Sequence, residues 1–216
     1  FNNISVESFL NDDKGNLWIG TEGEGLLHFN DFQEKFKTLR LSLDGYSSSN
    51  KISSFQFLKN NNSSIYIGAS SDLLKYNPLK KTFKQYKLQG KPLIYTIKKD
   101  ENGTIWAGGF TSGLLKHDKT TDTFKEVFSK ERNLLDRDVI EILPLNKNEL
   151  LVATWSGGLY RYLIKDNKFS PYLLNGLVVN RARCSFKDSK SNIWLGTDDG
   201  VFKIQPDGGI KHYTEN

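Results

Sequence analysis

The residues best suited to recognition chemistry are two aromatic side chains, Trp155 and Phe110, each followed in the sequence by hydroxyl residues. An exposed ring flanked by hydroxyl groups suits stacking on the face of a sugar. The repeated pattern described below requires no aromatic residue at either position. We therefore predict both as ligand-binding residues. The alternative is that Trp155 packs between two sheets and replaces a tryptophan that is missing at Leu151.

Polar residues in neighbouring predicted loops supply the complementary chemistry. Guanidinium, carboxylate and amide groups there are suited to bonding sugar hydroxyls or an acidic group. The residues predicted for this role are Arg181, Arg137, Asp138, Asn180 and Asp198. The alternative is that the arginines and Asp138 form ion pairs within the loops, and that Asp198 only forms a turn.

Residues for other chemistries are not grouped. The three histidines, His28, His117 and His212, are scattered, and no His, Cys and carboxylate cluster has the spacing of metal ligands. The sequence lacks a Gly-x-Ser-x-Gly elbow and a phosphate-binding Gly-x-x-x-x-Gly-Lys loop. We predict no catalytic residue, no cofactor and no metal site.

Composition narrows the class further. The 216 residues carry 30 basic and 25 acidic side chains, a net charge of +5, and 37% hydrophobic residues that support a packed core. Lysines alternate with apolar residues instead of forming a basic patch, so nucleic-acid binding is not expected. No apolar run approaches the ~18–20 residues that span a bilayer, so no membrane contact is expected. The single cysteine, Cys184, is expected to be a small buried residue.

The candidate loops belong to a unit that the chain repeats five times. Each copy reads as a polar turn, a short apolar strand with a central aromatic residue, a glycine, a tight loop and a second apolar strand. The central position holds Trp18, Tyr66, Trp106, Leu151 and Trp194, with spacings of 48, 40, 45 and 43 residues. That period, with four strands in each unit and no helix, is typical of a β-propeller.

The repeats predict the boundaries of the elements. The five units cover approximately residues 1–48, 49–90, 91–135, 136–176 and 177–216 of one propeller segment. In the first unit the four strands are expected at 4–10, 17–21, 25–29 and 35–39, and the fifth unit is expected to begin with a strand at 181–186. The glycines that follow the central position leave room for close packing between sheets; they are Gly20, Gly68, Gly108 and Gly196.

Three of the turns share a sequence feature. An aspartate stands six residues before the tryptophan, at Asp12, Asp100 and Asp188. We predict that its carboxylate bonds nearby backbone N–H groups and closes the turn. Five such blades either close by themselves or form an arc of a longer, seven-bladed propeller, and we favour the arc.

The pattern Asp-x-x-Gly-x-(Ile/Leu)-Trp-(Ile/Leu)-Gly-Thr-x-x-Gly-(Leu/Val) resembles the two-component regulator propeller repeat. Residues 180–197 are a close match, and the second and fourth units depart from the pattern at Tyr66 and Leu151. The resemblance implies the periplasmic sensor region of a hybrid two-component protein. Such regions usually hold two seven-bladed propellers ahead of a β-sandwich, a membrane helix and cytoplasmic kinase and regulator domains. Many of them detect products of polysaccharide breakdown.

The functional hypothesis is therefore a non-enzymatic, periplasmic propeller segment that senses an oligosaccharide and signals across the membrane to a kinase. Further propeller blades and a sensor dimer mate are the expected partners. Kinase, phospho-acceptor and receiver motifs are absent from the 216 residues. An interaction scaffold without small-molecule binding is the second hypothesis, and a propeller enzyme acting on polysaccharide is the third.

Overall fold

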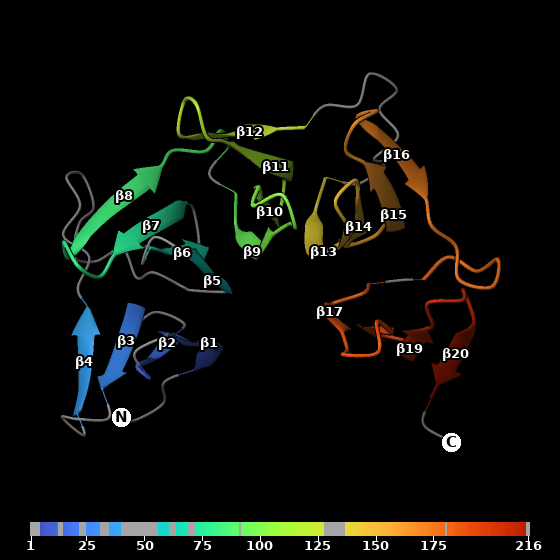
Figure 1. Cartoon of the computed structure of the whole chain (residues 1–216), viewed down its shortest axis with the longest axis horizontal. Helices are drawn as coiled ribbons and strands as arrows, with labels where there is room; N and C mark the ends of the chain where they lie inside the picture. Colours follow the sequence, from blue (N-terminus) through green and yellow to red (C-terminus); the bar gives the residue numbers. More distant parts are fainter. Residues whose placement is uncertain are drawn as a thin grey trace. The chain divides into compact units, whose positions relative to one another are not determined.

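The computed structural model describes residues 5–12, 15–21, 25–30, 35–39, 56–60, 64–68, 72–90, 92–127, 137–179 and 181–214. Every regular element in these ranges is a β-strand, and there are twenty of them (Figure 1). No helix in the described ranges is long and apolar enough to cross a membrane. The all-β prediction is confirmed.

The strands form five antiparallel sheets of four strands each. The first comprises β1 (Val6–Asn11), β2 (Leu17–Thr21), β3 (Gly25–Asn30) and β4 (Lys35–Leu39). The second comprises β5 (Gln56–Asn60), β6 (Ser64–Gly68), β7 (Leu73–Asn77) and β8 (Thr82–Tyr86). The third comprises β9 (Ile94–Lys99), β10 (Ile105–Gly109), β11 (Gly113–Asp118) and β12 (Thr123–Glu126).

The fourth sheet comprises β13 (Val139–Asn146), β14 (Glu149–Thr154), β15 (Gly158–Leu163) and β16 (Lys168–Pro171). The fifth comprises β17 (Cys184–Lys187), β18 (Ile193–Thr197), β19 (Gly200–Ile204) and β20 (Ile210–Tyr213). Within every sheet the spatial order follows the chain order, which is the meander of a propeller blade. Each sheet lies inside the range of one sequence repeat.

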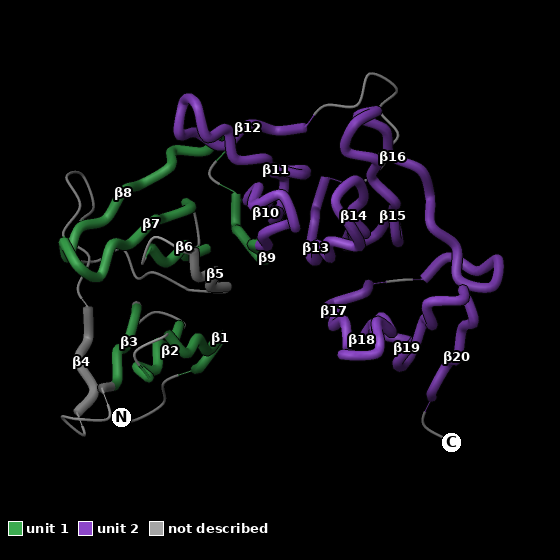
Figure 2. Tube along the Cα trace, in the orientation of Figure 1, with its two compact units in different colours: residues 1–97 green, residues 98–216 purple. Residues whose placement is uncertain are grey.

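The chain divides into two compact units, residues 1–97 and residues 98–216 (Figure 2). In the first unit, Trp18 of β2 packs against Ile65, Ile67 and Tyr76 of the second sheet. In the second unit, Trp106 of β10 packs in one cluster with Val152 and Tyr162 of the fourth sheet. In these two pairs the sheets are therefore joined by the aromatic residue at the centre of the second strand, as the repeat predicts.

The predicted start of the first strand in the fifth unit was wrong. The strand expected at 181–186 begins at Cys184, because Arg181 has a φ of 48°, which no β-strand residue adopts. Cys184 is also exposed instead of buried. Its side chain shares a sheet face with Trp194, and no described residue covers that face as the fourth sheet covers Trp106.

The aspartate of the turn does more than the sequence predicts. In all three copies one carboxylate oxygen accepts the backbone N–H four residues later, as expected. The other oxygen accepts the indole N–H of the tryptophan six residues later, at 3.0 Å for Asp12, 2.9 Å for Asp100 and 3.0 Å for Asp188. One carboxylate thus fixes both the turn and the orientation of the aromatic ring.

The two degenerate repeats lack both members of this pair. The second has Asn60 and Tyr66 at the equivalent positions, and the fourth has Leu145 and Leu151. A buried tryptophan needs an acceptor for its indole N–H, whereas leucine does not, so the two residues change together. Tyr66 and Leu151 still fill the core, since both are buried.

The expected close approach of a neighbouring sheet is confirmed at one glycine. A Cβ atom on Gly68 would lie 2.9 Å from the carbonyl oxygen and 2.9 Å from Cγ2 of Ile94, which begins β9. At Gly196 the tight contact is instead within its own sheet, 2.6 Å from the Sγ atom of Cys184. A side chain at either position would force neighbouring atoms to shift.

The buried aspartate–tryptophan pair should be a main source of stability. Asp100 and Trp106 are both buried, so Asp100→Ala leaves the indole N–H and the Thr104 N–H without this acceptor. We expect a loss of about 2–5 kcal/mol in the free energy of unfolding, measured by urea titration. The matched variant Asp188→Ala should cost less, because Asp188 and Trp194 are only half buried. Equal losses in the two variants would contradict this explanation.

The equivalent pair in the fifth sheet, Asp188 and Trp194, makes the stability of the fold depend on pH. The Trp194 indole N–H, followed by the Asn192 side chain, lowers the pKa of Asp188 from its ordinary 3.8 to about 2. Because the pKa is lower in the folded chain, the stabilisation is present above about pH 4 and is lost as pH falls toward 2. We expect Trp194→Phe to move the carboxyl titration midpoint back up, as followed by carbon-13 NMR. An unchanged midpoint would mean that the indole is not the cause.

Candidate functional site

The predicted binding residues that the structure describes all lie in the unit of residues 98–216, in connections between strands. Phe110 follows β10, Trp155 follows β14 and Asp198 follows β18. Each therefore stands in the connection between the second and third strands of a different sheet. Arg137 and Arg181 stand in the segments that lead from one sheet to the next. Asn180 lies outside the described residues.

Backbone contacts bring these connections together. The carbonyl of Asp138 accepts the backbone N–H of Trp155 at 2.9 Å, and its Oδ1 atom accepts the N–H of Thr111 at 2.7 Å. The carbonyl of Arg137 accepts the N–H of Gly113 at 2.9 Å. Asp138 therefore links the loop after Phe110 to the loop that carries Trp155. A connection within a sheet and a connection between sheets therefore meet at these loops.

The aromatic candidates form one cluster. The ring centroids of Phe110 and Trp155 are 5.4 Å apart with the planes tilted by 54°. Trp155 is half buried and packs against the core cluster that contains Leu151, Leu195 and Phe202. The packing role that we set against ligand binding is thus real for part of the ring.

The exposed part of Trp155 supports two arginines. The guanidinium carbon of Arg181 lies 4.8 Å from the centroid of the Trp155 ring, and that of Arg183 lies 5.2 Å from it. Cation–π contacts of this kind hold a guanidinium in place and leave its N–H edge available for hydrogen bonds. A ligand at this surface would therefore meet the two arginines as well as the ring of Trp155.

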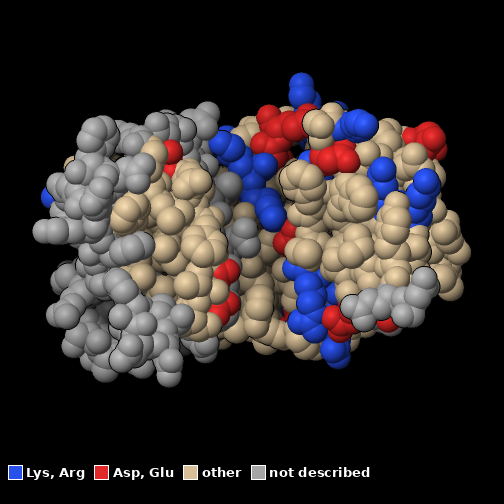
Figure 3. Space-filling model, turned by 90° about the horizontal axis from the view of Figure 1, so that it is seen from below, with Lys and Arg blue, Asp and Glu red and all other residues tan. Residues whose placement is uncertain are grey.

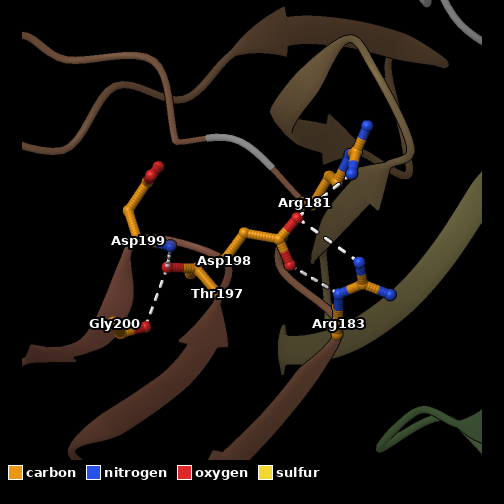
Figure 4. A network of polar contacts seen from close by, with 6 residues as sticks. All are labelled: Arg181, Arg183, Thr197, Asp198, Asp199 and Gly200. Atoms are coloured by element: carbon orange, nitrogen blue, oxygen red, sulfur yellow. Dashed lines mark hydrogen bonds and ion pairs between the residues drawn. The ribbon is translucent and has the colours of Figure 1, made fainter.

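Both arginines converge on Asp198 (Figure 4). Arg183 donates from Nε to Oδ1 at 2.6 Å and from Nη2 to Oδ2 at 3.3 Å, while Arg181 donates from Nη1 to Oδ2 at 3.3 Å. The adjacent Asp199 points away from the guanidiniums in Figure 4. The hydroxyl of Thr197 accepts the Asp199 N–H and donates to the Gly200 carbonyl, which fixes the loop that carries Asp198.

The electrostatics of this group follow from its contacts. The hydrogen bond from Arg183, and then the charges of Arg183 and Arg181, hold the pKa of Asp198 below its ordinary value. Asp198 is therefore ionised at neutral pH, and the three side chains together carry a net charge of +1. Figure 3 shows both basic and acidic side chains on the face of the molecule that it draws.

Arg137 takes a different partner from the one expected of a binding residue. It pairs with Glu126 at 2.8 Å across the loop that joins the third and fourth sheets. Burial raises the pKa of Glu126 and the charge of Arg137 opposes that rise. The prediction of an ion pair within the loop is thus confirmed for Arg137, and its side chain is not in contact with Arg181, Arg183 or Asp198 in any interaction described.

Sequence reasoning missed two features. Arg183 was assigned to a strand of the repeat, although it makes the shortest contact to Asp198. The available signal was the spacing Arg-x-Arg just before a strand, opposite the acidic loop at 198–199. A cavity of about 600 Å³ between the third and fourth sheets was also not predicted; its lining includes Lys116, His117, Lys125, Tyr162 and Asn167. Among the residues described, no group of three or more His, Cys, Asp or Glu side chains is arranged to hold a metal ion.

Comparison with known proteins places this arrangement in a class. The fold is that of a β-propeller, and a model of the family described as two component regulator propeller matches residues 1–23. The sequence resemblance is thereby confirmed within the first repeat. The sequence matches no curated protein at the level at which relatives are recognised.

Solved structures extend the likeness to the whole chain. The extracellular domain of the putative hybrid two component system BT3049 from B. thetaiotaomicron superposes with a TM-score of 0.79 at 21% identity, covering 98% of this chain and 30% of that one. The corresponding domain of BT4673 from the same organism gives 0.76 at 24% identity, covering 100% and 28%. The chain thus spans less than a third of these two neighbours.

The fold is shared more widely. Virginiamycin B lyase from Staphylococcus aureus superposes with a TM-score of 0.71 at 14% identity, covering 97% of this chain and 70% of that one. At this level of identity the likeness concerns the fold alone. Function must therefore be argued from the site.

The ion pairs of the site should not be a source of stability. Arg181, Arg183 and Asp198 are all substantially exposed, and exposed ion pairs contribute little to folding. We expect Asp198→Asn to leave the urea midpoint of unfolding unchanged within error, while Asp100→Ala lowers it. A large loss in Asp198→Asn would assign these residues to the scaffold instead of to binding.

Proposed function

We propose that this chain is a ligand-sensing propeller segment of the extracytoplasmic, periplasmic region of a hybrid two-component sensor. Its signal is an oligosaccharide derived from polysaccharide, and its output passes across the membrane to a kinase. The observation that carries the proposal is the cluster of Trp155, Phe110, Arg181, Arg183 and Asp198, built from connections of three sheets. The likeness to extracellular domains of putative hybrid systems supports the setting.

The position of the cluster suggests how binding would be communicated. Phe110 belongs to the third sheet, Trp155 to the fourth, and Asp198 to the fifth, so a bound ligand contacts three sheets at once. The affinity then depends on how these sheets are arranged, and binding favours one arrangement over another. In a linked sensor, binding would shift the population of molecules toward the favoured arrangement of the sheets.

The oligosaccharide hypothesis is tested by a calorimetric screen of the chain against a panel of neutral and acidic oligosaccharides. We expect binding of at least one saccharide and a loss of tenfold or more in affinity for Trp155→Ala, because the ring carries both the stacking surface and the arginines. Lys119→Gln is the control and should bind normally. Lys119 stands in the turn between β11 and β12, whereas Phe110 stands between β10 and β11. Absence of binding to every saccharide would refute the proposed function.

A second candidate, an interaction scaffold, is favoured by one face of the fifth sheet. Phe186 is 64% exposed, and Cys184, Val201 and Tyr213 are exposed beside the half-buried Trp194. The register places these side chains on one face, since Phe186 pairs with Trp194 and Val201 pairs with both Gly196 and Tyr213. The equivalent face around Trp106 is covered by the next sheet, so the occupant we propose is another sheet of this repeat type.

A second copy of the chain can supply such a sheet. The face of the second sheet that receives Trp18 carries Ile67 and Leu74. The equivalent face of the first sheet carries Ile19 and Leu27, which are buried, and Phe9, which is 65% exposed and is the side chain it offers to a second copy. We expect concentration-dependent association by light scattering, with Cys184 protected from maleimide at high concentration. Phe186→Ser should abolish both effects. A monomer with a fully reactive Cys184 at every concentration would exclude association through this face.

A further inference from the structure

The contacts of Trp155 change what kind of sugar the site can recognise. Arg181 and Arg183 lie over the indole ring at 4.8 and 5.2 Å, so a ligand that approaches this ring meets guanidinium groups. A neutral sugar stacks on an open aromatic face, whereas a guanidinium edge offers paired N–H donors to an oxyanion. The geometry therefore favours a ligand that carries negative charge.

The balance of charge and of hydrogen-bonding groups also favours a negatively charged ligand. Each guanidinium has five N–H donors, while Asp198 has about four acceptor positions for both of them. Two cations face one anion, and Asp199 points away from them (Figure 4). Arg181 is 44% exposed and Arg183 is 52% exposed, so both are accessible to a ligand. Arg181 gives Asp198 one hydrogen bond, from Nη1, so its remaining N–H donors can serve a second carboxylate or sulfate beside Arg183.

The backbone at Arg181 gives an independent indication. Its φ of 48° lies in the left-handed region, where glycine and asparagine are tolerated best and other residues cost roughly 1–2 kcal/mol. Thr111, whose N–H bonds to Asp138 in the same set of loops, also has a left-handed φ, of 63°. Left-handed backbone also occurs in turns outside this site, at Lys81, Asp122, Asn167, Asn175 and Ser191, so what distinguishes Arg181 is that its guanidinium lies over Trp155. The exposed ion pair of Arg181 does not repay that cost.

We propose that Arg181 and Arg183, held on Trp155, bind the oxyanion of an acidic oligosaccharide, either the carboxylate of a uronic acid or a sulfate ester. Asp198 holds the two guanidiniums in the absence of ligand and competes with the incoming anion. This inference rests on the proposed function and specifies the substrate class for the same site.

The test compares each acidic saccharide with its neutralised form. The chain is titrated with a galacturonate tetrasaccharide and its methyl ester, and with a sulfated chondroitin hexasaccharide and its desulfated form. We expect the chain to bind one of the acidic forms and to bind the neutralised form at least tenfold more weakly. Affinity should also fall as salt rises, because the interaction is ionic.

Three variants assign the effect to the arginines. Arg181→Asn removes the guanidinium but suits a left-handed φ, so the chain should fold normally and lose at least tenfold in affinity for the acidic form. Arg183→Lys keeps the charge but loses the bidentate geometry and should show a smaller loss. Asp198→Asn should bind several-fold more tightly, since the internal competitor is gone. Lys119→Gln, which removes one positive charge elsewhere in the same unit, should leave the affinity unchanged.

The outcomes separate this inference from the proposed function. If a neutralised form binds as tightly as its acid, the acidic class is wrong, although oligosaccharide binding stands. If an acidic form binds but Arg181→Asn and Arg183→Lys bind it normally, the arginine assignment is overturned. If the chain binds no member of the neutral and acidic panel, the proposed function fails and this inference fails with it.

Discussion

The hydrogen bond from a tryptophan indole to the aspartate of the preceding turn is the interaction on which three of the five sheets depend. The tryptophan must be buried between two sheets, and its N–H then needs an acceptor that is not water. The aspartate supplies it from a turn whose own backbone N–H groups bind the same carboxylate. Turn closure, ring orientation and packing of the next sheet thus share one residue. This explains why the repeats that lose the tryptophan lose the aspartate as well.

The packing between sheets has a direction. One face of a sheet carries the central residue of the second strand. This residue contacts the other kind of face on the sheet that follows, as Trp18 contacts Ile65 and Ile67. In the fourth sheet Leu151 takes the position of the tryptophan, and the half-buried Trp155 adds apolar volume to the same cluster. The ring is therefore part scaffold and part binding surface, and a site that uses it is coupled to the packing of the fourth and fifth sheets.

The candidate site combines a rigid platform with an exposed charged edge. Strands and buried clusters fix Trp155, and Trp155 in turn orients two arginines that would otherwise be flexible at the surface. The loops around it contain backbone in the left-handed region, so their conformation is set by the contacts across sheets and not by local preference. The proposed anion ligand would therefore meet guanidiniums that are already in place and would contact groups from separate sheets.

The sequence alone determined the number of repeats, the strands within them, and the turns at Asp12, Asp100 and Asp188, because these depend on neighbours close along the chain. It also selected Phe110 and Trp155 as aromatic residues that the repeat does not require, and Arg181 and Asp198 as polar loop residues. Only the tertiary structure decided that Arg183 joins them and that Arg137 pairs elsewhere, because the partners Asp198 and Glu126 stand 15 and 11 residues away, with folded strands or loops between. Cys184 was mispredicted for the same reason: burial of a strand residue depends on which sheet lies against it, and that is not a local property of the sequence.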